Sequence, residues 1–143
     1  MDLGPSQIPN RRELTPQELE IARSLENLSF LEITHRIFLL LVWRRLKIAS
    51  PVSISLLTYS RDPIGSSRKL ETTIKGAGLF IEPGPIIQER TKGVGPGKVF
   101  FVSNDEKELG SLSELWFGDH AHNPQVYREI GRMSGFPQSA IDT

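Results

Sequence analysis

The stretch SFLEITHRIFLLLVWRRLKIASPVSISLLTY, residues 29–59, combines a helical pattern with a strand pattern and so decides the fold class. Ser29 followed by Glu32 has the spacing of a capping box, which predicts a helix from there to about Lys47. A proline then ends the helical pattern. The residues 52–59 are rich in β-formers and predict a buried strand. This stretch therefore predicts a domain in which helix and strand share one core.

Working outward from this stretch, the flanking sequence completes an α+β fold. The run Thr15-Pro16-Gln17-Glu18 combines a cap, a first-turn proline and a capping box, and it predicts a helix reaching about Asn27. We expect a flexible arm over residues 1–13 and one α+β domain over 14–143, with an N-terminal helix pair, a small mixed sheet of three to four strands and C-terminal helices. Further elements are expected at 66–77 (helix), 79–82, 86–90 and 98–102 (strands), 103–117 and 124–133 (helices).

Composition limits the class of protein. The chain has 143 residues, an ordinary length for a single domain, and its 38% hydrophobic content is that of a globular protein. It contains no cysteine, which excludes disulfides, thiol nucleophiles and cysteine-ligated zinc and fits a reducing compartment such as the cytoplasm. The longest apolar run is seven residues, far short of the roughly 20 that a membrane span needs, so we expect no membrane span.

The formal net charge is zero, but the charges are segregated along the chain. Residues 1–35 carry three basic and six acidic groups, and residues 99–143 carry three basic and seven acidic groups. Residues 36–98 carry eleven basic and four acidic groups. Either the basic middle pairs with the acidic ends in the folded domain, or it presents a basic face to an anionic partner.

A helix-turn-helix resemblance exists at the start of the chain. The runs Leu14-Thr15-Pro16-Gln17-Glu18, Leu28-Ser29 and Glu32-Ile33 resemble the opening of response-regulator helix-turn-helix domains. That family places a polar, basic recognition helix next. Here the apolar run Phe38-Leu39-Leu40-Leu41-Val42 follows, which does not suit a DNA groove, so the resemblance stops at the capping signals of the first two helices.

Two sets of residues are candidates for a functional site. Asp119, His120 and His122 offer imidazole and carboxylate ligands for zinc, iron or manganese, and a divalent metal at this loop is the one cofactor that the sequence suggests. The alternative is a polar loop in which Asn123 caps the next helix. Anion or nucleic-acid binding is the second candidate, through the basic middle of the chain: Arg44, Arg45, Lys47, Arg68, Lys69, Arg90 and Lys92.

The apolar stretch from Ile37 to Trp43 suggests a third kind of contact. A helix that is apolar on every side is either central to a core or covered by a partner. Because the chain lacks a specific catalytic motif, we expect a non-enzymatic binding or interaction module, with a homo-oligomer or a protein partner on this helix. The alternatives are a metal-dependent, hydrolase-type enzyme using Asp119, His120 and His122, and a nucleic-acid-binding protein using the basic segment 36–98.

Overall fold

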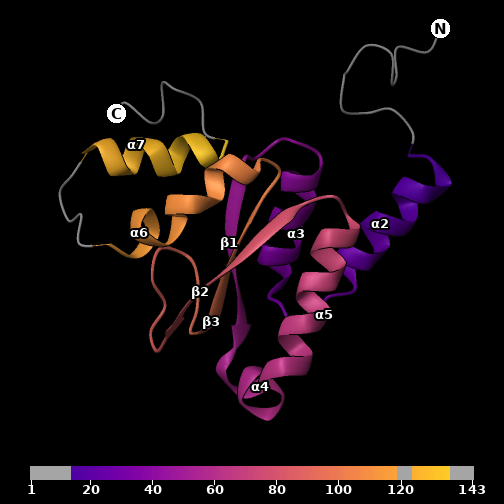
Figure 1. The fold of residues 1–143 in the computed structure, drawn as a ribbon, viewed down its shortest axis with the longest axis horizontal. Helices are drawn as coiled ribbons and strands as arrows, with labels where there is room; N and C mark the ends of the chain where they lie inside the picture. Colours follow the sequence, from indigo (N-terminus) through magenta and orange to yellow (C-terminus); the bar gives the residue numbers. More distant parts are fainter. Residues whose placement is uncertain (1–13, 119–123, 136–143) are drawn as a thin grey trace, which may run out of the picture.

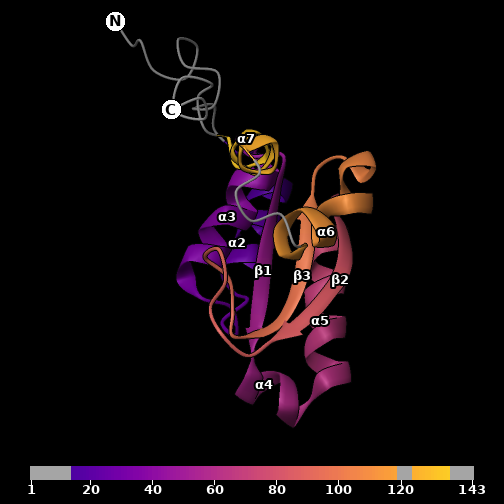
Figure 2. The ribbon, with the colours of Figure 1, turned by 90° about the vertical axis from the view of Figure 1, so that its left-hand side faces the viewer.

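The structure is a computed structural model, and it describes residues 14–118 and 124–135. Within these residues a three-stranded sheet carries helices on both of its faces (Figures 1 and 2). The elements in chain order are α2 (Pro16–Glu26), α3 (Ile33–Trp43), β1 (Ala49–Ser55), α4 (Leu56–Arg61), α5 (Pro63–Gly76), β2 (Phe80–Ile87), β3 (Gly97–Ser103), the 3₁₀ helix η2 (Glu106–Ser111), α6 (Leu112–Phe117) and α7 (Pro124–Met133). The predicted α+β fold is confirmed.

The sheet has the order β1-β3-β2, with β3 in the centre. Both pairings are antiparallel, so the expected mixed sheet is wrong. In β1 and β3, Ala49 lies opposite Ser103 and Ser55 lies opposite Gly97. Since successive side chains of a strand point to opposite faces, β3 supplies both layers of the core.

Two apolar clusters lie on the two faces of the sheet. On one face, Phe100 and Val102 pack with Val52 and Ile54 of β1 and with buried side chains of α2, α3 and α5. On the other face lie Ala49, Val99, Phe101, Leu109, Leu112, Trp116 and Met133, which join β1 and β3 to η2, α6 and α7. The N-terminal helices and the C-terminal helices are therefore on opposite faces (Figure 2).

The first helix begins where its capping signals predict. The backbone N–H of Glu18 donates to the Thr15 hydroxyl, and the Glu18 carboxylate accepts from the Thr15 backbone N–H. The next helix differs from the prediction, because α3 begins after Glu32, whose side chain makes no capping hydrogen bond, and ends at Trp43 rather than Lys47. The backbone N–H groups of Leu46 and Lys47 both donate to the Leu41 carbonyl, which closes the last turn of α3 and leads the chain toward β1.

The predicted strand at 52–59 is wrong in its second half. The strand β1 ends at Ser55, opposite the first residue of β3, and the helix α4 follows at once. The Ser55 hydroxyl accepts from the Thr58 backbone N–H and so caps α4. The helix expected at 66–77 begins earlier, as α5, because Asp62 caps it and Pro63 is its first residue.

Two other predicted elements also differ. The strands expected at 79–82 and 86–90 form one edge strand, β2, whose register shifts between Pro83 and Ile86. An edge strand tolerates prolines because the N–H groups of its free side bond to no neighbouring strand. The helix expected over 103–117 begins later, as η2 and α6. Ser103 is instead the last residue of β3, and its hydroxyl donates to the Ile48 carbonyl.

None of the helices within residues 14–118 and 124–135 combines the length and apolarity that crossing a membrane requires.

Candidate nucleic-acid interface

The helix α4 follows β1 at one end of the sheet, and α5 runs back from it along the face of the sheet that α2 and α3 also cover (Figure 1). Asp62 is the one residue between the two helices, and it is both the C-cap of α4 and the N-cap of α5. Its carboxylate accepts from the Gly65 backbone N–H at 2.9 Å, and its carbonyl accepts from the Ser66 hydroxyl at 2.7 Å. This joint fixes the direction of the 14-residue helix α5 relative to the six-residue helix α4.

The helix α5 has one buried and one exposed side. Ser66, Leu70 and Ile74 are buried against the core that α2, α3 and the sheet share. The opposite side carries Ile64, Arg68, Thr72 and Lys75, which recur at helical spacing and are all exposed. The Ile64 side chain is 71% exposed. Glu71, which is partly buried, lies at the border of this exposed side.

Four cationic side chains of α4 and α5 are exposed: Arg61, Arg68, Lys69 and Lys75. Within residues 14–118 and 124–135, none of these four forms an ion pair. The Lys69 ammonium lies 5.9 Å from the centre of the Phe30 ring. The two acidic groups on these helices are Asp62, whose carboxylate already caps α5, and Glu71. The helices α4 and α5 with Asp62 therefore carry four cations and two acidic groups, and none of the four cations forms an ion pair among the described residues.

A pocket of about 310 Å³ opens between the two helices and Phe30. Arg61, Lys69 and Thr58 line this pocket. The capping carboxylate of Asp62 also lines it, so the N-terminal amide groups of α5 are already partly satisfied there.

Two of the basic residues predicted from the sequence, Arg90 and Lys92, contact other parts of the fold. Arg90 donates to Glu32 at 3.0 Å and to the carbonyls of Gly93 and Gly95 at 3.3 Å. This contact, with the hydrogen bond as its main cause, lowers the pKa of Glu32 below its ordinary value. Lys92 donates to the Trp116 carbonyl at 2.6 Å.

Lys47 lies with its ammonium 4.2 Å from the centre of the Phe38 ring, and burial lowers its pKa. Arg44 lies 5.8 Å above the Trp43 ring, and Arg45 is exposed. These three residues lie between α3 and β1 in the chain, whereas Arg68 and Lys69 lie on α5. The seven predicted residues thus divide among separate elements, and Arg68 and Lys69 are the two that lie on α5.

His35 connects α3 to the edge of the sheet and to the loop between β2 and β3. It is 1% exposed, and its Nδ1 atom accepts from the Ser53 backbone N–H at 3.3 Å. The proton of the neutral ring therefore lies on Nε2, which donates to the Gly93 carbonyl at 3.3 Å. Burial is the main cause that lowers the pKa of His35, so the ring is neutral near pH 7. The Gly95 backbone N–H donates to the Ser53 hydroxyl at 3.1 Å and completes the attachment of the loop.

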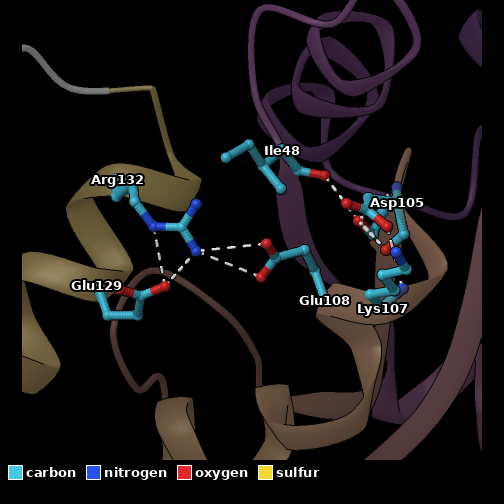
Figure 3. Close-up of polar contacts among 7 residues, drawn as sticks. Ile48, Asp105, Lys107, Glu108, Glu129 and Arg132 are labelled. Atoms are coloured by element: carbon cyan, nitrogen blue, oxygen red, sulfur yellow. Dashed lines mark hydrogen bonds and ion pairs between the residues drawn. The ribbon is translucent and has the colours of Figure 1, made fainter.

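A second polar cluster joins the C-terminal elements (Figure 3). The Arg132 guanidinium of α7 contacts the carboxylates of Glu129 and of Glu108, the latter on η2 at 3.3 Å. The hydrogen bond to Glu129 is the main cause that raises the pKa of Arg132. Because the arginine occupies both carboxylates, this cluster holds α7 against η2.

The metal ligands predicted from the sequence, Asp119, His120 and His122, lie outside the described residues. Among residues 14–118 and 124–135, no group of three histidine or carboxylate side chains could hold a metal ion.

Sequence reasoning missed Arg61 and Lys75 as members of the basic surface. The available signal was the pair Asp62-Pro63, in which a capping residue precedes a proline suited to the first helical position. Starting α5 there would have placed Arg68, Thr72 and Lys75 on one side of the helix.

Comparisons with models of protein families, with curated proteins and with solved structures find no match to this chain.

Proposed function

We propose that this protein binds double-stranded DNA through α4 and α5, with the exposed side of α5 in the major groove. The observation that carries the proposal is the set of four exposed cations on these two helices, none paired with an acidic group among the described residues. The major groove of double-stranded DNA is wide enough to admit an α-helix, whose side chains can then contact base edges. The expected non-enzymatic binding module then has nucleic acid as its partner.

The residues of α5 suit separate roles in such a complex. Arg68 lies in the N-terminal half of the exposed side, where a guanidinium reaches the O6 and N7 acceptors of guanine. Ile64, which is exposed and apolar, suits the methyl group of thymine. Lys75, further along the same side, and Arg61 and Lys69, which flank it, suit phosphate groups, which set the position of the protein but not its sequence preference.

Salt dependence measures how many of these cations contact phosphate. If Arg61, Lys69 and Lys75 do, the logarithm of the binding constant falls with a slope of roughly −2.7 against the logarithm of salt concentration. Between about 50 mM and about 200 mM salt the affinity then falls roughly 40-fold. Fluorescence anisotropy with a labelled, mixed-sequence duplex measures both quantities.

Charge-removing variants identify the surface. Arg61→Gln and Lys75→Gln should each weaken binding and reduce the salt slope by about 1. Lys107→Gln is the matched control, because Lys107 is also exposed but lies on η2, on the other face of the sheet. No binding at about 50 mM salt, or an equal loss of affinity in the Lys107 variant, would contradict the proposal.

A further inference from the structure

The free edge of β1 is covered at Ser53 by His35 of α3 and by the β2–β3 loop, residues 88–96. The strand β1 pairs with β3 along one side only. On the other side, the Ser53 backbone N–H donates to Nδ1 of His35 at 3.3 Å, and the Ser53 hydroxyl accepts from the Gly95 backbone N–H at 3.1 Å. Both His35 and Ser53 are buried. An imidazole ring therefore stands where a neighbouring strand would place its acceptor carbonyl.

The same ring also holds the loop. In its neutral form, Nε2 of His35 donates to the Gly93 carbonyl at 3.3 Å. The Arg90 guanidinium donates to that carbonyl at 3.3 Å as well, and it pairs at 3.0 Å with the carboxylate of Glu32, the N-cap residue of α3. The histidine and the ion pair thus attach the loop to the beginning of α3, next to the edge of β1.

The loop contributes little to the apolar core. Among residues 88–96, all of which the structure describes, Val94 is the one buried apolar side chain, and most of the others are exposed. Lys92 donates to the Trp116 carbonyl at 2.6 Å, a bond that an exposed lysine can exchange for water. Segments with few buried apolar contacts open locally at a lower free energy than the strands of a core. The loop can therefore separate from the domain while the sheet stays intact.

Protonation of His35 makes its surroundings unfavourable. Nδ1 becomes a donor and then faces the Ser53 N–H, which is also a donor. The ring also acquires a positive charge beside the Arg90 guanidinium, with which it shares the Gly93 carbonyl. Both conflicts lie between the loop, the edge of β1 and the beginning of α3, and both are relieved when the loop moves away.

Among the described residues, the charged groups that act on the ring are Glu32 and Arg90. Burial has the largest effect and lowers the pKa of His35 below its ordinary value of 6.5, against the opposing effects of the Gly93 hydrogen bond and Glu32. Arg90 adds to the lowering, and it already occupies the Glu32 carboxylate. The strand β1, residues 49–55, contains no ionisable side chain. The ring is therefore neutral at about pH 7, and its protonation needs a mildly acidic solution.

We propose that protonation of His35 releases the β2–β3 loop from β1 and α3 while the sheet stays folded, so that the loop acts as a pH-sensitive switch. Separation of the loop removes the contact between like charges, and it lets water solvate the ring and accept from the Ser53 N–H. It also uncovers the free edge of β1 at this point. The switch is independent of the proposed DNA binding, because α4 and α5 contribute none of its residues.

Hydrogen exchange of the full chain at about pH 7.5 and about pH 5 tests this switch, with each rate divided by the intrinsic rate at that pH. Protection of the Ser53 and Gly95 amides should fall about tenfold at the lower pH, because the open form gains at most about tenfold in population for each pH unit below the pKa of the released ring. Protection of the β3 amides should change less than about twofold.

Three results of this measurement overturn the proposal. Unchanged protection at Ser53 and Gly95 shows that the loop does not open. An equal loss of protection in β3 shows global unfolding instead of a local opening. A loss at Ser53 without one at Gly95 shows that the ring turns while the loop stays in place.

Two variants assign the response to His35. His35→Gln keeps a donor and an acceptor but carries no charge, so the pH dependence of exchange at Gly95 should disappear. His120→Gln with His122→Gln leaves His35 as the one histidine of the chain and should keep the full response. A response that persists in His35→Gln, or one that is lost in the double variant, overturns the proposal.

The double variant also decides the question if His35→Gln does not fold. Its NMR spectrum contains the ring signals of a single histidine, so the titration of His35 is followed directly. The ring should titrate at the pH at which the Gly95 amide loses protection. Separate midpoints for the two events exclude His35 as the trigger.

Discussion

Replacing His35 by phenylalanine tests the attachment of the β2–β3 loop to the rest of the domain. Phenylalanine keeps a ring of similar size but can neither accept from the Ser53 backbone N–H nor donate to the Gly93 carbonyl. A buried backbone group left without a partner costs about 1–3 kcal/mol. The Ser53 N–H is the buried group that loses its partner, because the Gly93 carbonyl also accepts from Arg90, so the expected loss in the free energy of unfolding is about 1–3 kcal/mol.

This loss is large for a domain of this size, whose total stability is typically about 5–15 kcal/mol. Urea denaturation, followed by tryptophan fluorescence and circular dichroism, measures it from the midpoint and the slope of the transition. Thr34→Phe is the control, because Thr34 lies beside His35 on α3 but is exposed. It should change the free energy of unfolding by less than about 0.5 kcal/mol.

Hydrogen exchange gives a local readout of the same substitution. In the natural protein the amide of Ser53 donates to His35 and the amide of Gly95 donates to the Ser53 hydroxyl. His35→Phe should accelerate exchange at both amides more than at β3, which lies in the centre of the sheet. A free energy of unfolding within about 0.5 kcal/mol of the natural value, with unchanged exchange at Ser53, would refute the assigned role of His35.

The same histidine predicts a pH dependence with a definite sign. Burial lowers the pKa of His35 in the folded protein below its ordinary value of 6.5, although the nearby Glu32 partly opposes this and Arg90 adds to it. The unfolded chain therefore binds more protons just below pH 6.5, and stability rises with pH through that window. His35 contributes fully above this window, and its contribution is lost as the pH falls through the folded-state pKa. In the His35→Phe variant, the free energy of unfolding should lose a pH dependence of at most about 1.4 kcal/mol per pH unit in this window.

Two further substitutions test the backbone of the fold. Gly97→Ala should destabilise the domain by at least about 2 kcal/mol, because the φ of Gly97 is +152° and an added Cβ would overlap the Ile54 carbonyl. Gly76→Ala is the control, because no atom lies within 4 Å of the Cβ it would add, and it should leave the thermal unfolding midpoint unchanged or raise it. Equal effects of the two substitutions would contradict this account. Asp62→Ala should lower the free energy of unfolding by about 1 kcal/mol through loss of the α5 cap, whereas Asp62→Asn should keep most of the stability. Equal unfolding midpoints for the natural protein and both variants would show that the cap contributes nothing.

Capping signals in the sequence were reliable where the cap and its partner are close along the chain. The start of α2 was predicted because Thr15 and Glu18 bond each other across one turn. The start of α7 at Pro124 follows equally from local signals. The signals failed at α3, where Ser29 and Glu32 form no capping box and Glu32 instead pairs with Arg90.

The boundary between β1 and α4 depended on tertiary pairing. Residues 52–59 have strand propensity throughout, yet β3 offers partners only as far as Ser55, and beyond it the chain turns into a helix. Local propensity yields to tertiary context in such a segment. For this reason α4 and its direct connection to α5 were not predicted, although Arg68 and Lys69 had been identified as basic candidates.

The sequence by itself determined the α+β class, the first helix, the approximate place of α5, β3 and α7, and the absence of disulfides, since each depends on composition or on residues within a few positions of one another. The tertiary structure decided which exposed basic residues contact other parts of the fold and which form no ion pair among the described residues. Arg90 meets Glu32, and His35 meets Gly93, across 58 residues of chain in each case. No local pattern encodes such pairs, because they form only when the β2–β3 loop folds back onto the beginning of α3.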